Sequence, residues 1–162
     1  MTGLEHGSRS DDGPVGAAAV CKHGDEWRTR RSYLGTGRMQ VFDAELWAIG
    51  LALGETVKRS ERLQEHGVKT GAVFSDSQAA IRRMAHLEPG QGQRLARRIN
   101  RRARALLAHG IATEIHWVPG HSGIPGNEEA DRQANLARDT GRNTAIERPY
   151  TSALNMARRI SE

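Results

Sequence analysis

The sequence predicts a mixed α/β domain. Three observations support this: a pair of strand-like segments near the N-terminus, a long apolar helical segment after it, and two later strand-like runs followed by helical periodicity. The expected order is three short strands, helix, strand, two helices, strand and helix, with the middle strand pairing on both sides. A length of 162 residues without internal repeats fits one folded domain with a C-terminal tail.

The N-terminal part begins weakly and then predicts a hairpin. Residues 1–13 are rich in Gly, Ser and Asp, and only about the first six could form a short strand. Residues 15–22 are small and apolar, whereas residues 26–34 alternate in polarity. Because His23-Gly24-Asp25 between them is a turn sequence, we expect two antiparallel strands.

Residues 41–58 place apolar side chains at helical spacing, and the apolar face is wide enough for a nearly buried helix. Glu45 falls within or beside this face. Such a glutamate usually lies at the edge of the face in water, whereas a carboxylate that is forced inward needs a metal ion or another cation. The polar residues 59–69 form a surface connection that could extend the helix.

The next strand ends at a carboxylate. Residues 71–75 are typical of a buried strand, Asp76 follows at its C-terminal end, and Ser77 is placed to cap a helix that runs to Leu87. Ligands of α/β sheets bind at the carboxyl ends of strands, which makes Asp76 a candidate site residue. The alternative is that Asp76 serves only as part of a helix cap.

A further helix, expected over residues 93–109, is strongly basic. Its apolar residues share one face, and most of its arginines spread over the opposite one. A solvated charged face is the usual meaning of such a run, but the lack of acidic residues among the arginines favours contact with phosphates. The arginines are Arg94, Arg97, Arg98, Arg101, Arg102 and Arg104.

Residues 117–131 combine turns, a histidine and carboxylates in one stretch. An alternating strand over residues 111–118 leads into Gly/Pro turns around His121, and a helix is expected over residues 128–137. Asp131 lies one turn into that helix, so its side chain can point back toward the strand ends.

The composition favours a polyanionic partner. The chain carries 24 Lys and Arg against 19 Asp and Glu, with a net charge of +5 and a pI of about 10.1. The alternative is a basic protein that is merely soluble. No apolar run approaches the roughly 18 residues of a membrane span, and no signal peptide is evident, so we expect an intracellular protein of the nucleus or cytoplasm. The single cysteine, Cys21, is expected to be a small buried hydrophobe.

Glu45, Asp76 and Asp131 are far apart in sequence, yet each falls on an element that could direct it to one end of the sheet. Three carboxylates that converge repel one another unless cations hold them. Hard divalent ions prefer such oxygen ligands, and two ions about 3.5–4 Å apart can activate water and stabilise a leaving oxygen in phosphodiester cleavage. The three residues are therefore candidate metal ligands.

Three ordered motifs resemble type 1 ribonuclease H domains, most closely those attached to reverse transcriptases of non-LTR retrotransposons. The motifs are Val41-Phe42-Asp43-Ala44-Glu45-Leu46, Phe74-Ser75-Asp76-Ser77-Gln78-Ala79-Ala80, and the 117–131 stretch that ends Gly126-Asn127-Glu128-Glu129-Ala130-Asp131. The similarity covers roughly residues 6–140. We accordingly expect a ribonuclease H-like domain over residues 1–140 and a linker with a short helix over residues 141–162.

The resemblance implies a ribonuclease H-like α/β fold, with a five-stranded mixed sheet of order 3-2-1-4-5 flanked by helices. It also implies endonucleolytic hydrolysis of the RNA strand of RNA–DNA hybrids with Mg²⁺ or Mn²⁺, two ions being expected where the first site is functional. By position, Glu45, Asp76 and Asp131 match the metal-binding catalytic carboxylates. His121 matches a loop histidine that assists proton transfer or product release. Positions near the substrate backbone in the family are matched by Ser8, Gln78 and Asn127.

The resemblance fails at one position. The family opens with Thr-Asp-Gly-Ser, whose aspartate contacts both metal ions, whereas this chain has Glu5-His6-Gly7-Ser8. Imidazole is a poorer Mg²⁺ ligand than a carboxylate and cannot bridge two ions as a carboxylate can. Glu5 is not a simple substitute, because successive strand residues point to opposite faces. Three explanations stay open: a weak or inactive nuclease of intact fold, an N-terminus altered or truncated relative to its natural source, or a neighbouring carboxylate that stands in.

Two functions follow: a ribonuclease H, or a catalytically inactive domain of the same fold that binds hybrids. Polynucleotidyl transfer on this fold is disfavoured, because the loop at residues 120–123 has no place in the short acidic motifs of those families. The expected partners are an RNA–DNA hybrid and, in the same polyprotein, a reverse transcriptase domain. The helix over residues 93–109 lacks the lysine-tryptophan protrusion of some cellular members, so we expect Arg97, Arg98 and Arg101 to contact the phosphates of the DNA strand.

Overall fold

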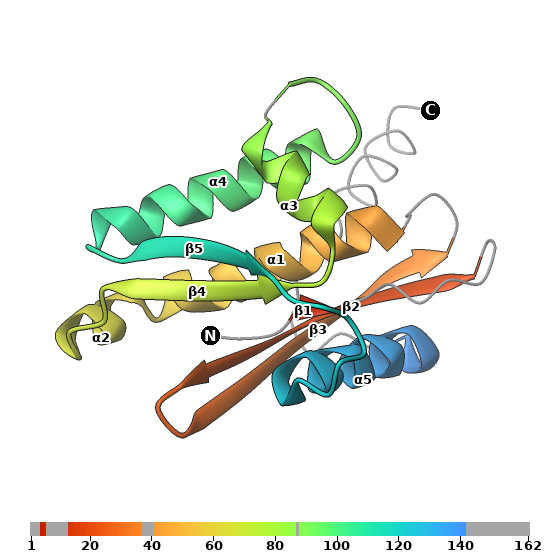
Figure 1. The fold of residues 1–162 in the computed structure, drawn as a ribbon, viewed down its shortest axis with the longest axis horizontal. Coiled ribbons are helices and arrows are strands. Elements are labelled where there is room, and N and C mark those ends of the chain that lie inside the picture. Colours follow the sequence, from red (N-terminus) through yellow and green to blue (C-terminus); the bar gives the residue numbers. More distant parts are fainter. Residues whose placement is uncertain (1–3, 6–12, 37–40, 87, 142–162) are drawn as a thin grey trace, which may run out of the picture.

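The secondary structure is a mixed β-sheet with helices on both faces (Figure 1). The computed structural model describes residues 4–5, 13–36, 41–86 and 88–141. In these residues the strand order is β3-β2-β1-β4-β5. The strands are β1 (Leu4–Glu5), β2 (Pro14–His23), β3 (Glu26–Thr36), β4 (Thr70–Ser75) and β5 (Ala112–Trp117).

Two ladders carry most of the pairing. β2 and β3 form the expected antiparallel hairpin, with the turn at Gly24 and Asp25, where Gly24 has a φ of 57°. β4 and β5 run parallel. The two described residues of β1 join the ladders, because Leu4 pairs antiparallel with Ala19 of β2 and parallel with Ser75 of β4.

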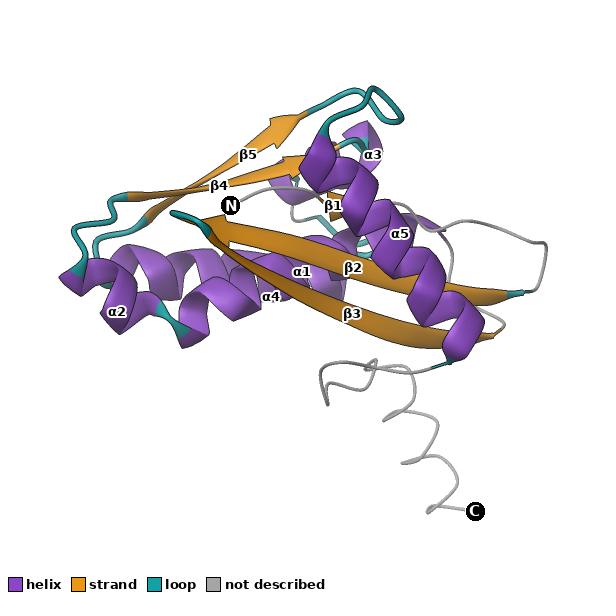
Figure 2. Cartoon of the chain, turned by 90° about the horizontal axis from the view of Figure 1, so that it is seen from below, coloured by secondary structure: helices purple, strands orange, loops and turns teal. Residues whose placement is uncertain are grey.

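Helices α1 and α5 cover opposite faces of the β2–β3 ladder, and α4 lies beside α1 (Figure 2). β2 is therefore enclosed on both sides, and Ala17, Ala18 and Ala19 are completely buried. The helices are α1 (Val41–Lys58), α2 (Ser60–Glu65), α3 (Gln78–Ala85), α4 (Gln93–Ala108) and α5 (Pro125–Thr140).

Small residues on β2 let α5 approach very closely. A Cβ atom added at Gly16 would collide with the backbone carbonyl oxygen of Ala134 in α5. Only glycine leaves room for this contact, so Gly16 sets the distance between the helix and the sheet.

None of the described helices is both long and apolar enough to cross a lipid bilayer.

Several helix boundaries differ from the expectation: α3 ends at Ala85 rather than at residue 87, and α5 ends at Thr140 rather than at about residue 137. α5 begins at Pro125 rather than at residue 128, because proline suits the first turn of a helix, where its missing N–H needs no partner. The connection after α1 does not extend that helix but forms the separate short helix α2, since Arg59 leaves helical geometry with a ψ of 6°. The helix expected within residues 141–162 lies outside the described residues.

Candidate active site

Asp76 follows directly after β4 and is held by the end of β5. Ser75 and Trp117 form the last pair of the β4–β5 ladder, and the backbone N–H of Val118 donates to the carbonyl of Ser75 at 3.0 Å. The indole N–H of Trp117 donates to the carbonyl oxygen of Asp76 at 3.1 Å. On the other side, Ser77 caps α3 as expected, because its hydroxyl accepts from the N–H of Ala80 at 3.2 Å.

The loop over residues 118–124 joins β5 to α5 and contacts both Asp76 and Asp131. A Cβ atom at Gly120 would lie 2.5 Å from Oδ2 of Asp76, so this part of the loop touches the carboxylate. The next residue, His121, has a φ of 51° and directs Nδ1 toward Oδ2 of Asp131 at 3.4 Å. The imidazole is 70% exposed and the carboxylate 14% exposed. One loop thus brings two carboxylates and a solvent-accessible imidazole together.

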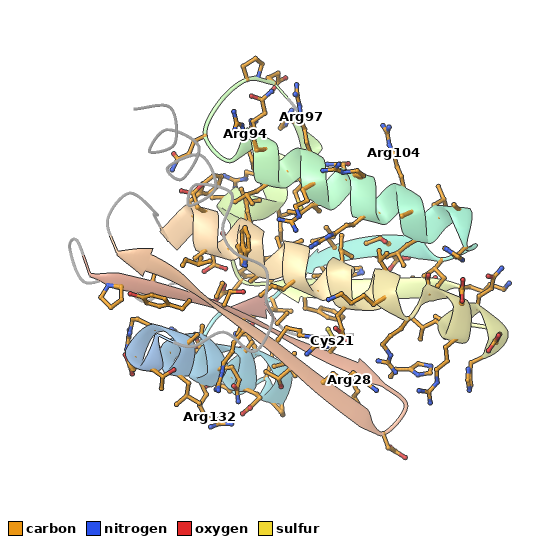
Figure 3. The ribbon with its side chains drawn as sticks, turned by 180° about the vertical axis from the view of Figure 1, so that it is seen from behind. Cys21, Arg28, Arg94, Arg97, Arg104 and Arg132 are labelled. Atoms are coloured by element: carbon orange, nitrogen blue, oxygen red, sulfur yellow. The ribbon has the colours of Figure 1, made fainter. Side chains whose placement is uncertain are left out.

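Charges around Asp131 are partly neutralised by one another. Arg132 follows Asp131 in sequence but binds Glu129 through two hydrogen bonds of 2.7 and 2.8 Å. The hydrogen bond from Arg132, with a further one from Gln133, lowers the pKa of Glu129. Figure 3 shows Arg132 on α5, at the edge of the molecule.

Glu45 is buried rather than lying in water at the edge of its helix. It is 3% exposed on α1, which packs against β1 and against β4, the strand that leads to Asp76. Burial of a carboxylate among apolar neighbours is unfavourable without a cation or hydrogen bonds.

Two of the residues expected near the substrate backbone are described. Gln78 is exposed in the first turn of α3, where its side-chain oxygen accepts from Arg82 at 3.1 Å. Asn127 is 1% exposed in the first turn of α5. Ser8, and His6 at the position of the missing aspartate, lie outside the described residues.

The arginines of α4 divide into two sets. Arg98 and Arg102 face α1: the guanidinium of Arg98 lies 5.4 Å from the ring centre of Trp47, and Arg102 donates to the carbonyl of Gly50. The other set is exposed on the outer side of the helix, where Figure 3 shows three of its members extending away from the ribbon. This outer set consists of Arg94, Arg97, Arg101 and Arg104.

The carboxylates fit a hard divalent cation by their chemistry. Within the described part of the chain, Oε2 of Glu45 and Oδ1 of Asp76 are buried and make no hydrogen bond, although both residues make other interactions. Asp131 contributes a third carboxylate. Among the residues that the structure describes, no group of three or more His, Cys, Asp and Glu side chains is arranged to hold an ion.

The sheet and the carboxylate at the end of β4 define an α/β domain of the ribonuclease H-like class. The RNase H family matches residues 6–139, and the chain belongs to this family, which acts on RNA–DNA hybrids. The family match supports ribonuclease H activity as the general activity of the chain. A comparison with curated proteins finds no match.

Solved structures of the same family are similar to the chain. An N-terminal RNase H domain from Mycobacterium tuberculosis, solved as a fusion with maltose-binding protein, is 24% identical, with a TM-score of 0.62. The match covers 85% of this chain and 91% of that one. RNase H1 from Halobacterium salinarum is 26% identical with a TM-score of 0.56, over 85% of this chain and 95% of that one.

Sequence reasoning assigned no role to Trp117 or Gly120, although both lie in the 117–131 stretch. The available signal was a tryptophan at the end of a strand, followed by a Pro-Gly pair that is also typical of an ordinary turn. Their contacts with Asp76 became evident only from the pairing of β4 with β5.

Proposed function

We propose that this domain hydrolyses the RNA strand of RNA–DNA hybrids endonucleolytically, with Glu45, Asp76 and Asp131 as ligands of Mg²⁺ or Mn²⁺. The observation that carries the proposal is the loop at the end of the β4–β5 ladder. In this loop Gly120 contacts the Asp76 carboxylate, and His121 contacts the Asp131 carboxylate. When bound, two such ions would polarise the attacking water and stabilise charge on the leaving oxygen.

The loop and the two helix N-termini beside it supply side chains for distinct tasks. The largely exposed His121 lies 3.4 Å from Asp131, where its imidazole could exchange a proton with solvent or product. Asn127 lies in the first turn of α5 and Gln78 begins α3, where a backbone phosphate would meet helix N-termini. We propose that both residues contact the substrate backbone.

The outer arginines of α4 supply contact with the phosphates of the DNA strand. Arg97 and Arg101 are exposed and fit this role as expected, whereas Arg98 is half-buried against Trp47. We propose that Arg97 and Arg101, with Arg104, bind phosphates and that Arg98 acts mainly through α1. Recognition through the backbone and the 2′-hydroxyl would give little sequence preference.

The phosphate contacts are tested by comparing two variants. The triple change Arg97→Gln, Arg101→Gln and Arg104→Gln should weaken hybrid binding at low salt and reduce the slope of log K against log salt by about 2 to 3. The double change Arg98→Gln and Arg102→Gln should mainly lower the thermal midpoint, because it removes contacts to α1. Unchanged affinity of the triple variant at low salt would contradict the assignment.

The activity is tested with a hybrid whose RNA strand is labelled, incubated with Mg²⁺ or Mn²⁺ beside an all-RNA duplex of the same sequence. We expect internal cleavage of the hybrid only, and loss of cleavage in Glu45→Gln and Asp131→Asn. His6 stands where the family has an aspartate, and we expect His6→Asp to raise cleavage with Mg²⁺. Equal rates for the wild type and His6→Asp would refute this last expectation.

The histidine that the chain has at position 6, in place of the family's aspartate, favours a second function: a domain that binds hybrids but does not cleave them. This alternative predicts binding with a steep salt dependence and no cleavage under any metal condition. We further propose that residues 1–140 form an intracellular domain that acts beside a reverse transcriptase domain, with residues 141–162 as a linker. Cleavage during reverse transcription by such a polyprotein would test that context.

A further inference from the structure

Three residues at the end of β5, Trp117, Val118 and Gly120, contact Asp76 or the residue before it. The backbone of Ser75, next to Asp76, is fixed by the N–H of Val118, and the carbonyl of Asp76 by the indole of Trp117 at 3.1 Å. Gly120 then closes against the side chain, with a Cβ position 2.5 Å from Oδ2. Contacts from one strand end therefore reach both the main chain and the carboxylate of a single residue.

Gly120 is constrained by the space around it and not by its backbone conformation. Its φ is outside the positive region, in contrast to Gly123, which has a φ of 76° and open space around its Cβ position. Alanine could adopt the backbone of residue 120, so the obstacle to a side chain is the Asp76 carboxylate itself. The lack of a side chain at Gly120 therefore allows the loop to contact the Asp76 carboxylate.

Trp117 is held by a polar contact more than by burial. It is 51% exposed, one of two large hydrophobic side chains exposed among the described residues. An indole ring that gives up this much burial gains less from the hydrophobic effect, and its N–H donates a hydrogen bond to the Asp76 carbonyl at 3.1 Å. The ring therefore lies beside the candidate site, and its indole N–H points toward the end of β4, where Asp76 lies.

We propose that Trp117 and Gly120 are positioning residues that fix the Asp76 carboxylate in the orientation in which it binds a divalent cation. The proposal rests on the proposed function and extends it to residues that would not touch the metal or the substrate. Carboxylate ligands must be held within a fraction of an ångström of their working position, and hydrogen bonds behind the ligand commonly provide this.

The first test measures Mn²⁺ binding by calorimetry with no nucleic acid present. Trp117→Phe keeps an aromatic ring but removes the N–H, and should weaken Mn²⁺ binding about threefold to tenfold, the loss expected for one hydrogen bond. With hybrid as substrate, kcat should fall while KM stays near the wild-type value. The matched control is Trp47→Phe, because the buried indole nitrogen of Trp47 makes no hydrogen bond with any described residue, and Mn²⁺ affinity should stay unchanged.

The second test is a double-mutant cycle on the contact itself. Gly120→Ala should lower the thermal midpoint in the wild-type background, where the new methyl group meets Oδ2 of Asp76. In an Asp76→Ala background the same change should cost nothing, because the carboxylate is gone. Gly120→Ala should also weaken Mn²⁺ binding at least as much as Trp117→Phe. Equal losses of midpoint in both backgrounds would overturn the proposed contact.

The outcomes separate the two proposals. Normal Mn²⁺ binding by the wild type, its loss in Asp76→Asn, and its retention in both Trp117→Phe and Gly120→Ala would overturn only the positioning roles. A wild-type chain that binds no Mn²⁺, or an Asp76→Asn variant that binds it equally well, would overturn the assignment of Asp76 and with it the proposed function.

Discussion

Gly16 and Gly120 are both positions where a Cβ atom would collide with a neighbour, but the neighbours differ. At Gly16 the obstacle is the main chain of α5, and at Gly120 it is the carboxylate of Asp76. The first close approach joins a helix to the sheet, whereas the second presses a loop against a polar side chain. Glycine therefore serves helix packing in one half of the sheet and the candidate site in the other.

The surroundings of the two glycines follow this division. β2 lies between α1 and α5, and its residues from Val15 to Cys21 are buried. In β5, by contrast, Glu114, His116 and Trp117 are exposed. Substitutions near β2 should therefore change stability, and substitutions near the end of β4 and β5 should change chemistry.

The largest effect is expected for Asp76→Asn. Loss of this carboxylate removes a ligand of ions that contribute several kcal/mol to the transition state, so cleavage should fall by at least about a hundredfold. The thermal midpoint should not fall, because one source of repulsion among the carboxylates is removed. The matched control is Asp139→Asn, an exposed aspartate at the end of α5 that pairs with Arg138 and should leave cleavage unchanged.

The converse pattern is expected for Gly16→Ala. The methyl group would push α5 away from β2, an overpacking cost of about 1–3 kcal/mol, while cleavage per folded molecule well below the midpoint stays near that of the wild type. Thermal and urea unfolding measure the loss. The control is Gly50→Ala, whose Cβ would meet Arg102 at an ordinary 3.5 Å. If Gly16→Ala lost activity without losing stability, the division between the halves would be wrong.

A smaller, pH-dependent effect is expected from Cys21, at the end of β2. Burial, together with the negative charge of Glu55, raises the pKa of the Cys21 thiol from 9.0 to about 11. The folded state thus keeps the proton where the unfolded chain loses it. This contribution to stability is fully present below pH 9 and is lost as the pH rises toward 11, by about 1.4 kcal/mol at pH 10. Unfolding of the wild type and Cys21→Ala should diverge over this range, and parallel pH profiles would refute the effect.

Local patterns were sufficient for most of the fold. The predicted helix over residues 41–58 has the bounds of α1, because its periodicity is long and uninterrupted. The hairpin and the Ser77 cap were also predicted correctly, since each depends on residues close together in sequence. The family match confirms the ribonuclease H domain, while the place of β1 in the strand order depends on Leu4 and Glu5 alone among the described residues.

Contacts between segments that are distant in the chain could not be predicted from the sequence. Helical periodicity could not show whether Glu45 faces water or the interior, and only the packing of α1 on the sheet makes it 3% exposed. In the same way, Arg98 looked equivalent to its basic neighbours until Trp47 on another helix supplied a partner. The roles of the site residues remain predictions, because they depend on ions and substrate as well as on the chain.

The position of β3 at the edge of the sheet has a consequence for the behaviour of the protein at high concentration. An edge strand of 11 residues offers a long row of backbone groups to which a second molecule could pair. β3 carries Arg28, Arg30 and Arg31, and a like-charged strand approaching it would be repelled. The basic residues of this strand therefore also protect the chain from edge-to-edge association, a protection that should weaken as salt screens the charges.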